Sequence, residues 1–334
     1  MGKLSKKDLD EMLTCVKRDR RVIVPPRSGF DSGVHLLEND KCIVISADPC
    51  VGVPLKWFGW LLVHYAASDV ALFGAKPEFC TITLLGPQST KSETFAHVMR
   101  QVCTAANELC MAIITGHTGT YEELSTLTGV CTAYGVISRN KLLTPSSAKP
   151  GDFVYCTKPL GQEVAVNFSL THKAAATKIF GTEKTRKLEN QVEMESCVKE
   201  AMLLAKIDGV HAMHDATEGG LITALNEMAD ASKVGFRIDY ENIPLAEGVQ
   251  ELRSRFALSE KQLLSMSSTG TILAAVSPEA AERVENVLRQ NGIHPARLGT
   301  FTRSTRRILM KNSKETSFLQ YADDPYARIL SGHV

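Results

Sequence analysis

Two aspartates in apolar segments are the N-terminal residues best placed to do chemistry. Asp48 follows Cys42–Ala47, a run rich in β-branched residues that predicts a buried strand with Asp48 where its backbone stops. Asp69 lies within Trp57–Phe73, a segment with no polar face, which predicts a helix packed on nearly all sides. An ionised carboxylate there is costly unless it is paired, hydrogen-bonded or bound to a cation. Asp69 therefore has two possible interpretations. It is a buried carboxylate held by backbone amides or by an arginine, or it belongs to a metal or phosphate site.

Two glycine-containing stretches carry further groups that could face a ligand. In residues 27–34, glycines let backbone amides approach a ligand closely beside Asp31, although many such stretches are simply turns. The apolar run Met111–Thr115, expected to be a third buried strand, leads into Gly116-His117-Thr118. Small residues around a histidine at a strand end are typical of a phosphate- or metal-facing turn. The alternative is a hairpin turn with a solvated imidazole.

The second half of the chain repeats the arrangement of a strand that ends in an aspartate and is followed by a helix. The run Gly209–His214 predicts a short strand ending at Asp215, and a helix to about Ala231 follows. Asp215 or Thr217 can cap that helix. Gly219 and Gly220 lower helix stability, so they indicate close packing or a ligand against bare backbone.

Breaks in the hydrophobic pattern divide the chain into two domains, expected at residues 1–148 and 149–334. In the first, Thr90–Glu93 predicts a capping box at the start of a helix. In the second, Gly299–Arg303 and Arg306–Met310 predict a closing hairpin. The tail from Asn312 is polar and poorly patterned.

Composition excludes several classes of protein. The net charge of the 334 residues is +1, so no field for nucleic acid or an anionic membrane is evident, and the cluster Lys17–Arg21 is interpreted as a solvated helix end. The nine cysteines are scattered without a Cys-x-x-Cys pair, which favours reduced core thiols over disulfides or a zinc site. No signal peptide is evident, and Trp57–Phe73 is short for a membrane span. A soluble, cytoplasmic protein is expected.

Six stretches of the chain carry recognisable motifs in a fixed order: Asp31–Val34, Ile45–Asp48, Ala67–Pro77, Gly116–Thr118, Lys149–Asp152 and His214–Leu221. The specific blocks are the helix end Ser-Asp-x-x-x-x-Gly-Ala-x-Pro and the motif Asp-x-Thr-x-Gly-Gly-Leu. This order is the one seen in the aminoimidazole ribonucleotide (AIR) synthase superfamily, which the chain resembles over roughly residues 27 to 310. The group includes the hydrogenase maturation protein HypE, thiamine monophosphate kinase and selenophosphate synthetase, and the chain looks most similar to HypE-like, AIR-synthase-related proteins.

The resemblance implies a two-domain, PurM-like α/β (α+β) fold, with the N-terminal domain forming an intersubunit β-barrel in a homodimer. It implies ATP and Mg²⁺ as cofactors, with ATP between the domains near the subunit boundary. By position, Asp31, Asp48 and Asp69 match the family's metal- and phosphate-site acids. His117 and Asp215 match catalytic positions. The expected nucleotide-binding residues are Gly33, Gly116, Thr118, Thr217, Gly219 and Gly220.

The expected function is activation of a carbonyl, amide or other acceptor oxygen by phosphoryl transfer from ATP, on an unidentified small-molecule or protein substrate. The chain differs from many relatives at Ala66 and Gly119, and at His117, where several carry aspartate. HypE also ends in a cysteine, whereas the last cysteine here is Cys197. Two alternatives stay open: a nucleotide-binding maturation or scaffold protein without turnover, and a small-molecule kinase of the thiamine monophosphate kinase type.

Overall fold

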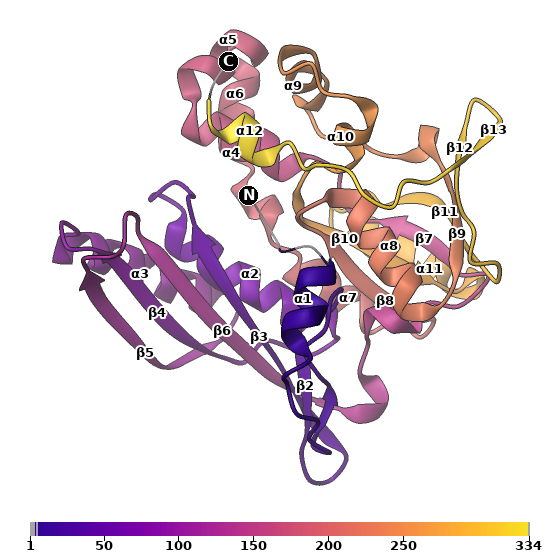
Figure 1. Cartoon of the computed structure of the whole chain (residues 1–334), viewed down its shortest axis with the longest axis horizontal. Helices are drawn as coiled ribbons and strands as arrows, with labels where there is room; N and C mark the ends of the chain where they lie inside the picture. The colour runs from indigo at the N-terminus through magenta and orange to yellow at the C-terminus, as the bar shows by residue number, and fades with distance from the viewer. Residues whose placement is uncertain (1–3, 5, 333–334) are drawn as a thin grey trace. The chain divides into compact units, whose positions relative to one another are not determined.

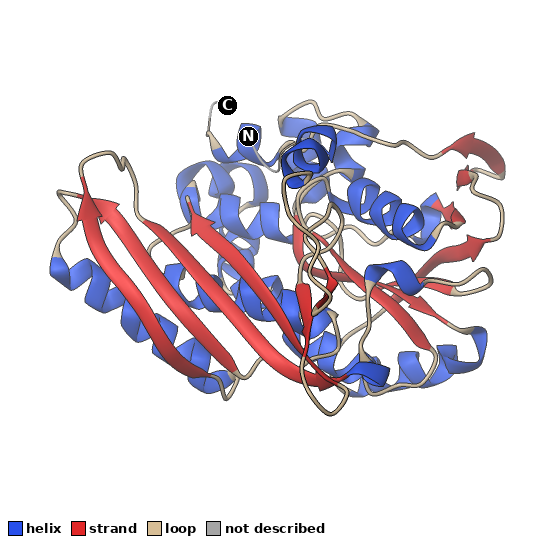
Figure 2. Ribbon diagram, turned by 60° about the horizontal axis from the view of Figure 1, so that its bottom comes forward, coloured by secondary structure: helices blue, strands red, loops and turns tan. Residues whose placement is uncertain are grey.

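The computed structural model describes residue 4 and residues 6–332 (Figures 1 and 2). The chain divides into two compact units, which we call the N-terminal unit (Met12–Leu142) and the C-terminal unit (Leu143–Val334 with Met1–Glu11). Each unit is built on one mixed sheet with helices. Residues 333 and 334, at the end that the sequence compares with the terminal cysteine of HypE, lie outside the described residues. Among the helices of the described part, none has the length and apolar character needed to cross a membrane.

The N-terminal unit contains a six-stranded sheet in the order β1-β2-β3-β6-β4-β5. Neighbouring strands are antiparallel, except that β4 and β5 are parallel. The long β3–β6 ladder forms the middle of the sheet, from Lys41 opposite Ser138 to Val51 opposite Thr128. The strands are β1 (Val22–Val24), β2 (Gly33–Leu36), β3 (Lys41–Val51), β4 (Phe79–Pro87), β5 (Ala112–Tyr121) and β6 (Thr128–Ser138).

Two helices, α2 (Phe58–Leu72) and α3 (Ser92–Glu108), cover one face of this sheet, as Figure 2 shows. Helix α2 is apolar on all sides because it packs against both the sheet and α3, and 14 of its 15 residues are buried. The prediction of a helix packed on nearly all sides is therefore confirmed. The short helix α1 (Lys6–Leu13) precedes this unit, and none of its residues is buried.

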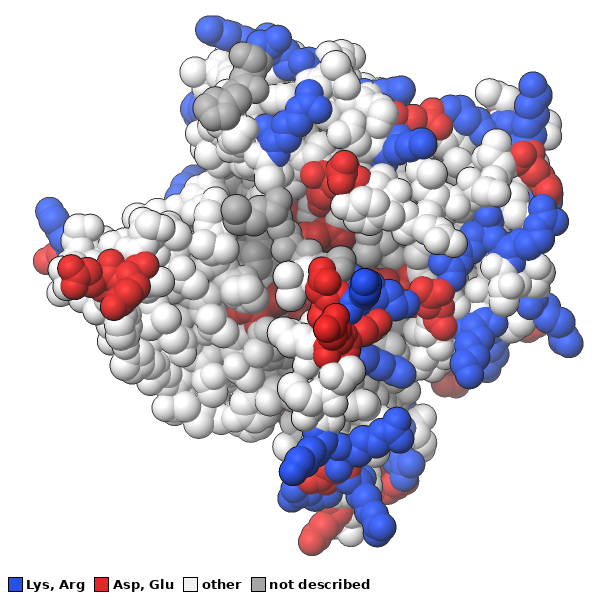
Figure 3. Space-filling model, in the orientation of Figure 1, with Lys and Arg blue, Asp and Glu red and all other residues white. Residues whose placement is uncertain are grey.

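The opposite face of the sheet carries no helix of its own unit. Residues alternate along β3, β4 and β6, with side chains of one parity buried under the helices and those of the other parity partly or fully exposed. Figure 3 shows few charged side chains over this open face. The large hydrophobic residues exposed on strands β3, β5 and β6 are Ile45, Val51, Ile114, Tyr121 and Val136.

Three predictions for this unit are wrong in detail. Strand β3 does not stop at Asp48, because it stays paired with β6 as far as Val51. The run expected to be a third buried strand belongs to β5, which is an exposed edge strand and continues through Gly116–Thr118 to Tyr121 instead of turning. The capping box is absent, since the residue before α3 is Lys91 and its side chain makes no capping hydrogen bond.

The C-terminal unit contains a seven-stranded sheet in the order β13-β12-β9-β11-β7-β10-β8. All neighbours are antiparallel except β12 and β9, which are parallel. The strands are β7 (Phe153–Cys156), β8 (Val210–Ala216), β9 (Gly235–Asp239), β10 (Ser268–Val276), β11 (Ala296–Thr302), β12 (Arg307–Lys311) and β13 (Lys314–Ser317).

Helix α8 (Gly220–Ser232) packs on β8 and, through side chains such as Leu225 and Met228, joins a core that includes Phe236 and Phe301. A second hydrophobic cluster is formed largely by helices around α4. The other helices of this unit are α4 (Gln162–Thr171), α5 (Lys173–Phe180), α6 (Thr182–Glu189), α7 (Val198–Leu204), α9 (Val249–Arg255), α10 (Glu260–Leu264), α11 (Ala281–Gln290) and α12 (Tyr326–Leu330).

The predicted closing hairpin is wrong, because β9 lies between β11 and β12 and it is β12 and β13 that form the hairpin. Alternation alone could not reveal a strand inserted from 60 residues earlier in the chain. The tail from Asn312 is also more ordered than its polar sequence indicates. It forms β13 and α12, and Phe318 and Ile329 are buried.

Candidate functional site

In the N-terminal unit, a buried hydrogen bond joins the sheet to the apolar helix α2. Asp69 is 8% exposed in the last turns of α2, and the Ser46 hydroxyl donates to its Oδ2 at 2.7 Å. Such a bond offsets part of the cost of removing the carboxylate from water. This hydroxyl partner is of a kind that the sequence alone did not indicate.

Asp48 lies on the same face of β3 as Ser46, because side chains two residues apart in a strand point to the same side. It is half-buried and opposite Cys131 of β6. Since Ser46 contacts Asp69, the carboxylates of Asp48 and Asp69 both belong to the space between β3 and α2.

Asp31 belongs to the same end of the N-terminal unit. The β2–β3 ladder ends with Gly33 opposite Ile45, so the residues before Gly33 continue past the part of β3 that leads to Asp48. Phe30 also packs edge-to-face on Phe73, the residue that ends α2, with ring centroids 6.4 Å apart. The ladder and this aromatic contact place the loop of Asp31 near the end of α2 that carries Asp69.

The residues at Asp31 offer oxygen atoms that suit an ion or a phosphate. Ser32 is buried, and its hydroxyl has no hydrogen-bond partner among the described residues. Carboxylate and hydroxyl oxygens are hard donors of the kind that Mg²⁺ prefers. Asp31, Asp48 and Asp69 do not converge as one compact ligand group in the described part of the chain. A cation near them would therefore need further oxygens, such as those of water or phosphates.

His117 lies elsewhere in this unit. It is exposed on the edge strand β5, opposite Thr83 of β4, and its Nε2 is 2.8 Å from the Tyr121 hydroxyl. Thr83 belongs to the open face of the sheet, so His117 does too, whereas Thr118 lies on the helix-covered face. Strands β6 and β4 separate β5 from β3, so a single N-terminal unit does not bring His117 together with Asp48.

Gly116 has a packing reason to be glycine. A Cβ atom at this position would lie 2.0 Å from the Ile82 carbonyl oxygen of β4, so no side chain fits. The pairing of β4 with β5 shifts register just before this point, between Cys80 and Thr81. The close approach of two strands thus accounts for Gly116 without a ligand.

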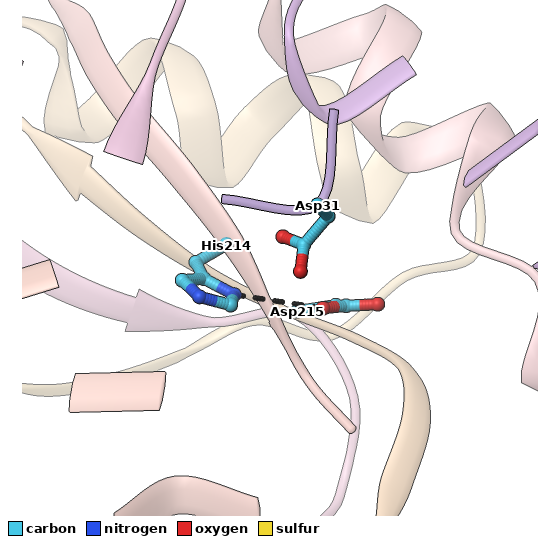
Figure 4. Close-up of side chains that lie close together, drawn as sticks. All are labelled: Asp31, His214 and Asp215. Atoms are coloured by element: carbon cyan, nitrogen blue, oxygen red, sulfur yellow. Dashed lines mark ion pairs between the residues drawn. The ribbon is translucent and has the colours of Figure 1, made fainter. Parts of the chain in front are cut away.

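In the C-terminal unit, His214 and Asp215 are both buried near the end of β8. His214 Nε2 is 3.0 Å from Glu227 Oε2, and His214 Nδ1 is 3.5 Å from Asp215 Oδ1, the ion pair drawn in Figure 4. A buried imidazole between two carboxylates can take up or hold a proton, so this group has acid–base capacity. Asp215 does not end the strand as predicted, since β8 continues to Ala216.

The glycine motif after β8 is a tight turn whose amides already have acceptors. Gly219 and Gly220 both have positive φ angles, +79° and +51°, which disfavour any other residue. The Gly220 amide donates to the Thr217 carbonyl oxygen at 2.8 Å, and the Gly219 amide donates to Asp324 Oδ2 at 3.0 Å. Helix α8 starts at Gly219 without a side-chain cap from its own turn, so the predicted cap by Asp215 or Thr217 is wrong.

Three polar residues of these regions were missed in the sequence. Ser46 could have been found, because strand alternation puts it on the face of Asp48. Asp324 stands in an Asp-Asp-Pro step typical of a helix start, within the tail considered unpatterned. Glu163 of α4 is buried, accepts hydrogen bonds from the Ser267 hydroxyl and the Thr269 amide, and belongs to a helix that was not predicted.

Comparison with known proteins decides the family. The model of the AIR synthase related protein N-terminal domain matches residues 29–137, and that of the C-terminal domain matches residues 149–311. The chain belongs to the AIR synthase related family. The resemblance carried by the sequence motifs is thereby confirmed, and the fold is the mixed α/β, two-domain PurM-like fold.

Individual relatives are consistent with this family assignment. Carbamoyl dehydratase HypE of Cupriavidus necator is 25% identical over 303 residues, which cover 86% of this chain and 81% of that protein. Selenide, water dikinase of Carboxydothermus hydrogenoformans is 26% identical over 339 residues, with 93% and 95% covered. The crystal structure of hydrogenase maturation protein HypE in complex with ATP has a TM-score of 0.72 at 20% identity, with 88% and 89% covered. At that identity, the structural likeness shows the fold.

Proposed function

We propose that this family member is an ATP- and Mg²⁺-dependent enzyme that transfers a phosphoryl group from ATP to a carbonyl, amide or other acceptor oxygen. The bond from the γ-phosphorus to the β–γ bridging oxygen breaks, a bond from phosphorus to the acceptor oxygen forms, and ADP leaves. The observation that carries the proposal is the Ser46–Asp69 hydrogen bond, which holds a buried carboxylate beside β3 and Asp48. The names of the relatives support it, since they include a dehydratase, a dikinase and an ATP complex.

Asp31, Asp48 and Asp69 are the residues proposed to hold Mg²⁺, directly or through its water. The ion, when bound, supplies positive charge that neutralises the phosphates during transfer. The protein's part is to orient the three carboxylates. The Ser46 hydroxyl does this for Asp69, and the Phe30–Phe73 contact fixes the loop of Asp31.

For the nucleotide, we propose Gly33 and Thr217 as contact residues. Gly116 and Thr118 of the edge strand β5 are proposed as contacts only from a second copy of the chain, because β3, β6 and β4 separate β5 from Gly33. Gly219 and Gly220 would act indirectly, since their amides already donate within the C-terminal unit. Their role is then to shape the turn that carries Thr217.

Asp215 and His117 are the proposed catalytic residues. Asp215 is buried beside His214, an arrangement in which a carboxylate and an imidazole can share a proton. His117 faces the open side of the sheet, so its proposed role requires something bound against that face.

A second copy of the chain is the partner we propose for the open face. Its exposed apolar residues lie on β3, β5 and β6, and few charges interrupt them (Figure 3). An apolar sheet face of this kind marks an interaction surface. In such a homodimer, His117 would lie at the interface.

A nucleotide-binding protein without turnover is the second candidate, because His117 lies apart from the carboxylates within one unit. The deciding experiment incubates purified protein with Mg-ATP and pooled metabolites or partner proteins from its source and measures ADP. Acceptor-dependent ADP release that is lost in Asp215→Asn supports the enzyme. Tight Mg-ATP binding without ADP release from any pool would favour the scaffold.

A further inference from the structure

The C-terminal segment is tied across the C-terminal unit by a series of hydrogen bonds. The Asn226 side chain donates to the Leu319 carbonyl oxygen at 2.8 Å, and the Ser265 hydroxyl donates to the Asp323 carbonyl oxygen at 2.8 Å. Farther along, Arg328 donates to the Phe256 carbonyl oxygen at 2.6 Å. The first two bonds hold the backbone of the segment, and the third holds the segment through the Arg328 side chain.

Asp324 is the residue of this segment with the most directed contacts. Its Oδ2 accepts from the Gly219 amide at 3.0 Å, and its Oδ1 accepts from the amides of Tyr326 at 2.9 Å and Ser267 at 3.4 Å. Burial raises the pKa of the Asp324 carboxyl, while the three amides lower it. One carboxylate thus joins the start of α8, the start of α12 and the segment before β10.

The Gly219 contact has a special electrostatic character. Gly219 is the N-cap residue of the 13-residue helix α8, at the end of the helix where amides without intrahelical partners and the helix dipole favour a negative charge. In many nucleotide-binding proteins a phosphate takes such a position. Here a carboxylate from more than a hundred residues away in the chain takes it instead.

The turn held by Asp324 packs against the segment around Ser267, which Asp324 also contacts. A Cβ atom on Gly220 would lie 2.5 Å from the Met266 carbonyl oxygen, so the turn and the 264–268 segment are in close contact. Glu163 holds the same segment from its other side, through the Ser267 hydroxyl at 2.7 Å. Loss of Asp324 would therefore remove the carboxylate from the Gly219 amide, whereas the 264–268 segment would keep its bond to Glu163.

We propose that Asp324 is a positioning residue, whose carboxylate replaces a phosphate at the start of α8 and fixes the turn that carries Asp215 and Thr217. The proposal rests on the proposed function for its link to nucleotide. Two consequences follow. The phosphates of ATP do not bind the Gly219 amide, and the C-terminal segment is needed for a well-formed site and not only for stability.

The test compares Asp324→Asn with Asp323→Asn in the full chain. Asp323 is the adjacent residue, carries the same charge and is exposed, so its substitution is the matched control. Hydrogen exchange is measured in peptides covering residues 215–220 and 264–268, and Mg-ATP affinity is measured by calorimetry at a temperature where both variants are folded.

We expect Asp324→Asn to raise amide exchange in both peptides about tenfold, because an asparagine offers only one acceptor oxygen and no charge. We expect Mg-ATP affinity to fall by a similar factor, Asp324→Glu to restore part of both losses, and Asp323→Asn to change neither. Addition of Mg-ATP should leave the Gly219 amide's exchange in the wild type unchanged. If Asp324→Asn does not fold, Asp324→Glu is compared with Asp323→Glu, and the displaced carboxylate should still raise exchange at 215–220.

Unchanged exchange in Asp324→Asn would overturn the proposal, as would a loosened turn with wild-type Mg-ATP affinity, since Asp324 would then be only structural. Strong protection of Gly219 by Mg-ATP would also overturn it. If the wild type does not bind Mg-ATP, the proposed function fails. The exchange comparison still decides, on its own, whether Asp324 positions the turn.

Discussion

The Ser46 hydroxyl and the Asp69 carboxylate form a buried hydrogen bond of 2.7 Å that joins β3 to the otherwise apolar helix α2. The bond explains how an acidic residue is tolerated in a helix with 14 buried residues. It also sets the orientation of a carboxylate that we propose to be functional.

Replacement of Ser46 by alanine should therefore destabilise the protein. Asp69 would lose a donor in a buried position, which costs about 1–3 kcal/mol in the free energy of unfolding. Urea denaturation monitored by circular dichroism measures the change. Ser138→Ala, at an exposed strand end, is the control and should change stability by less than about 0.5 kcal/mol. Equal effects of the two substitutions would show that the Ser46–Asp69 bond contributes nothing.

The buried Glu163 predicts a pH dependence of stability. Burial raises the pKa of Glu163 to about 7 from 4.5, although the hydrogen bonds from Thr269 and Ser267 lower it. In the unfolded chain the carboxyl loses its proton near pH 4.5, whereas in the folded protein it keeps the proton up to about pH 7. The contribution of Glu163 to stability is thus fully present below pH 4.5 and is lost as the pH rises to about 7.

Glu163→Gln removes this titration and should flatten the stability profile. Relative to the wild type, the variant should gain up to about 3 kcal/mol between pH 4.5 and pH 8. Chemical denaturation at several pH values checks this. The exposed Glu282→Gln serves as the control and should follow the wild-type profile. A Glu163→Gln profile parallel to that of the wild type would mean that Glu163 has an ordinary pKa.

Two ion pairs of the C-terminal unit should differ sharply in their response to mutation. Lys158 and Glu200 are 2.8 Å apart and both nearly fully buried, and Lys158 also donates to the Met194 and Ser196 carbonyl oxygens. Lys158→Met would leave Glu200 buried without its partner and should cost about 3–5 kcal/mol in the free energy of unfolding.

The exposed pair Lys187–Glu247 is the control, and Lys187→Met should cost at most about 1 kcal/mol. The double variant Lys158→Met with Glu200→Leu should recover part of the loss, because no charge is then left unpaired. Similar costs for Lys158→Met and Lys187→Met would contradict the buried location of the first pair.

The open face of the N-terminal sheet predicts a homodimer. Light scattering at micromolar concentration should give about twice the chain mass of 36.5 kDa. A charge at the centre of the face, in Ile45→Asp or Val136→Asp, should shift the mass to that of one chain. Val16→Asp, also exposed but outside the sheet, should leave the mass unchanged. A wild-type mass near 36.5 kDa would exclude a dimer at that concentration.

Much of the fold could be predicted from local sequence. The apolar segment around Asp69, the strand before Asp48 and the glycine motif after Asp215 all have patterns set by neighbouring residues, and each element is present. The motifs in these elements follow one another in the order seen in the family.

What could not be predicted depends on partners distant in the chain. The conformation at Gly116 depends on the close approach of Ile82 in the neighbouring strand. The segment is therefore a strand where the sequence predicts a turn. The cap of α8 comes from Asp324, more than a hundred residues away, so no local motif could indicate it. Strand order likewise depends on β9, which separates two strands that are consecutive in sequence.

Mg²⁺-dependent ATP binding tests the central proposal most directly. Calorimetric titrations with and without Mg²⁺ are compared for the wild type, Asp48→Asn, Asp69→Asn and the control Asp40→Asn. Asp40 is exposed and has a positive φ angle of 57°, which asparagine tolerates. We predict that Mg²⁺ strengthens ATP binding in the wild type and in Asp40→Asn. In Asp48→Asn and Asp69→Asn, loss of a charged ligand should weaken Mg-ATP binding by about 1.5–3 kcal/mol while the fold is kept. If Asp48→Asn and Asp69→Asn both bind ATP as the wild type does, with and without Mg²⁺, the result would contradict a metal and nucleotide site at these carboxylates.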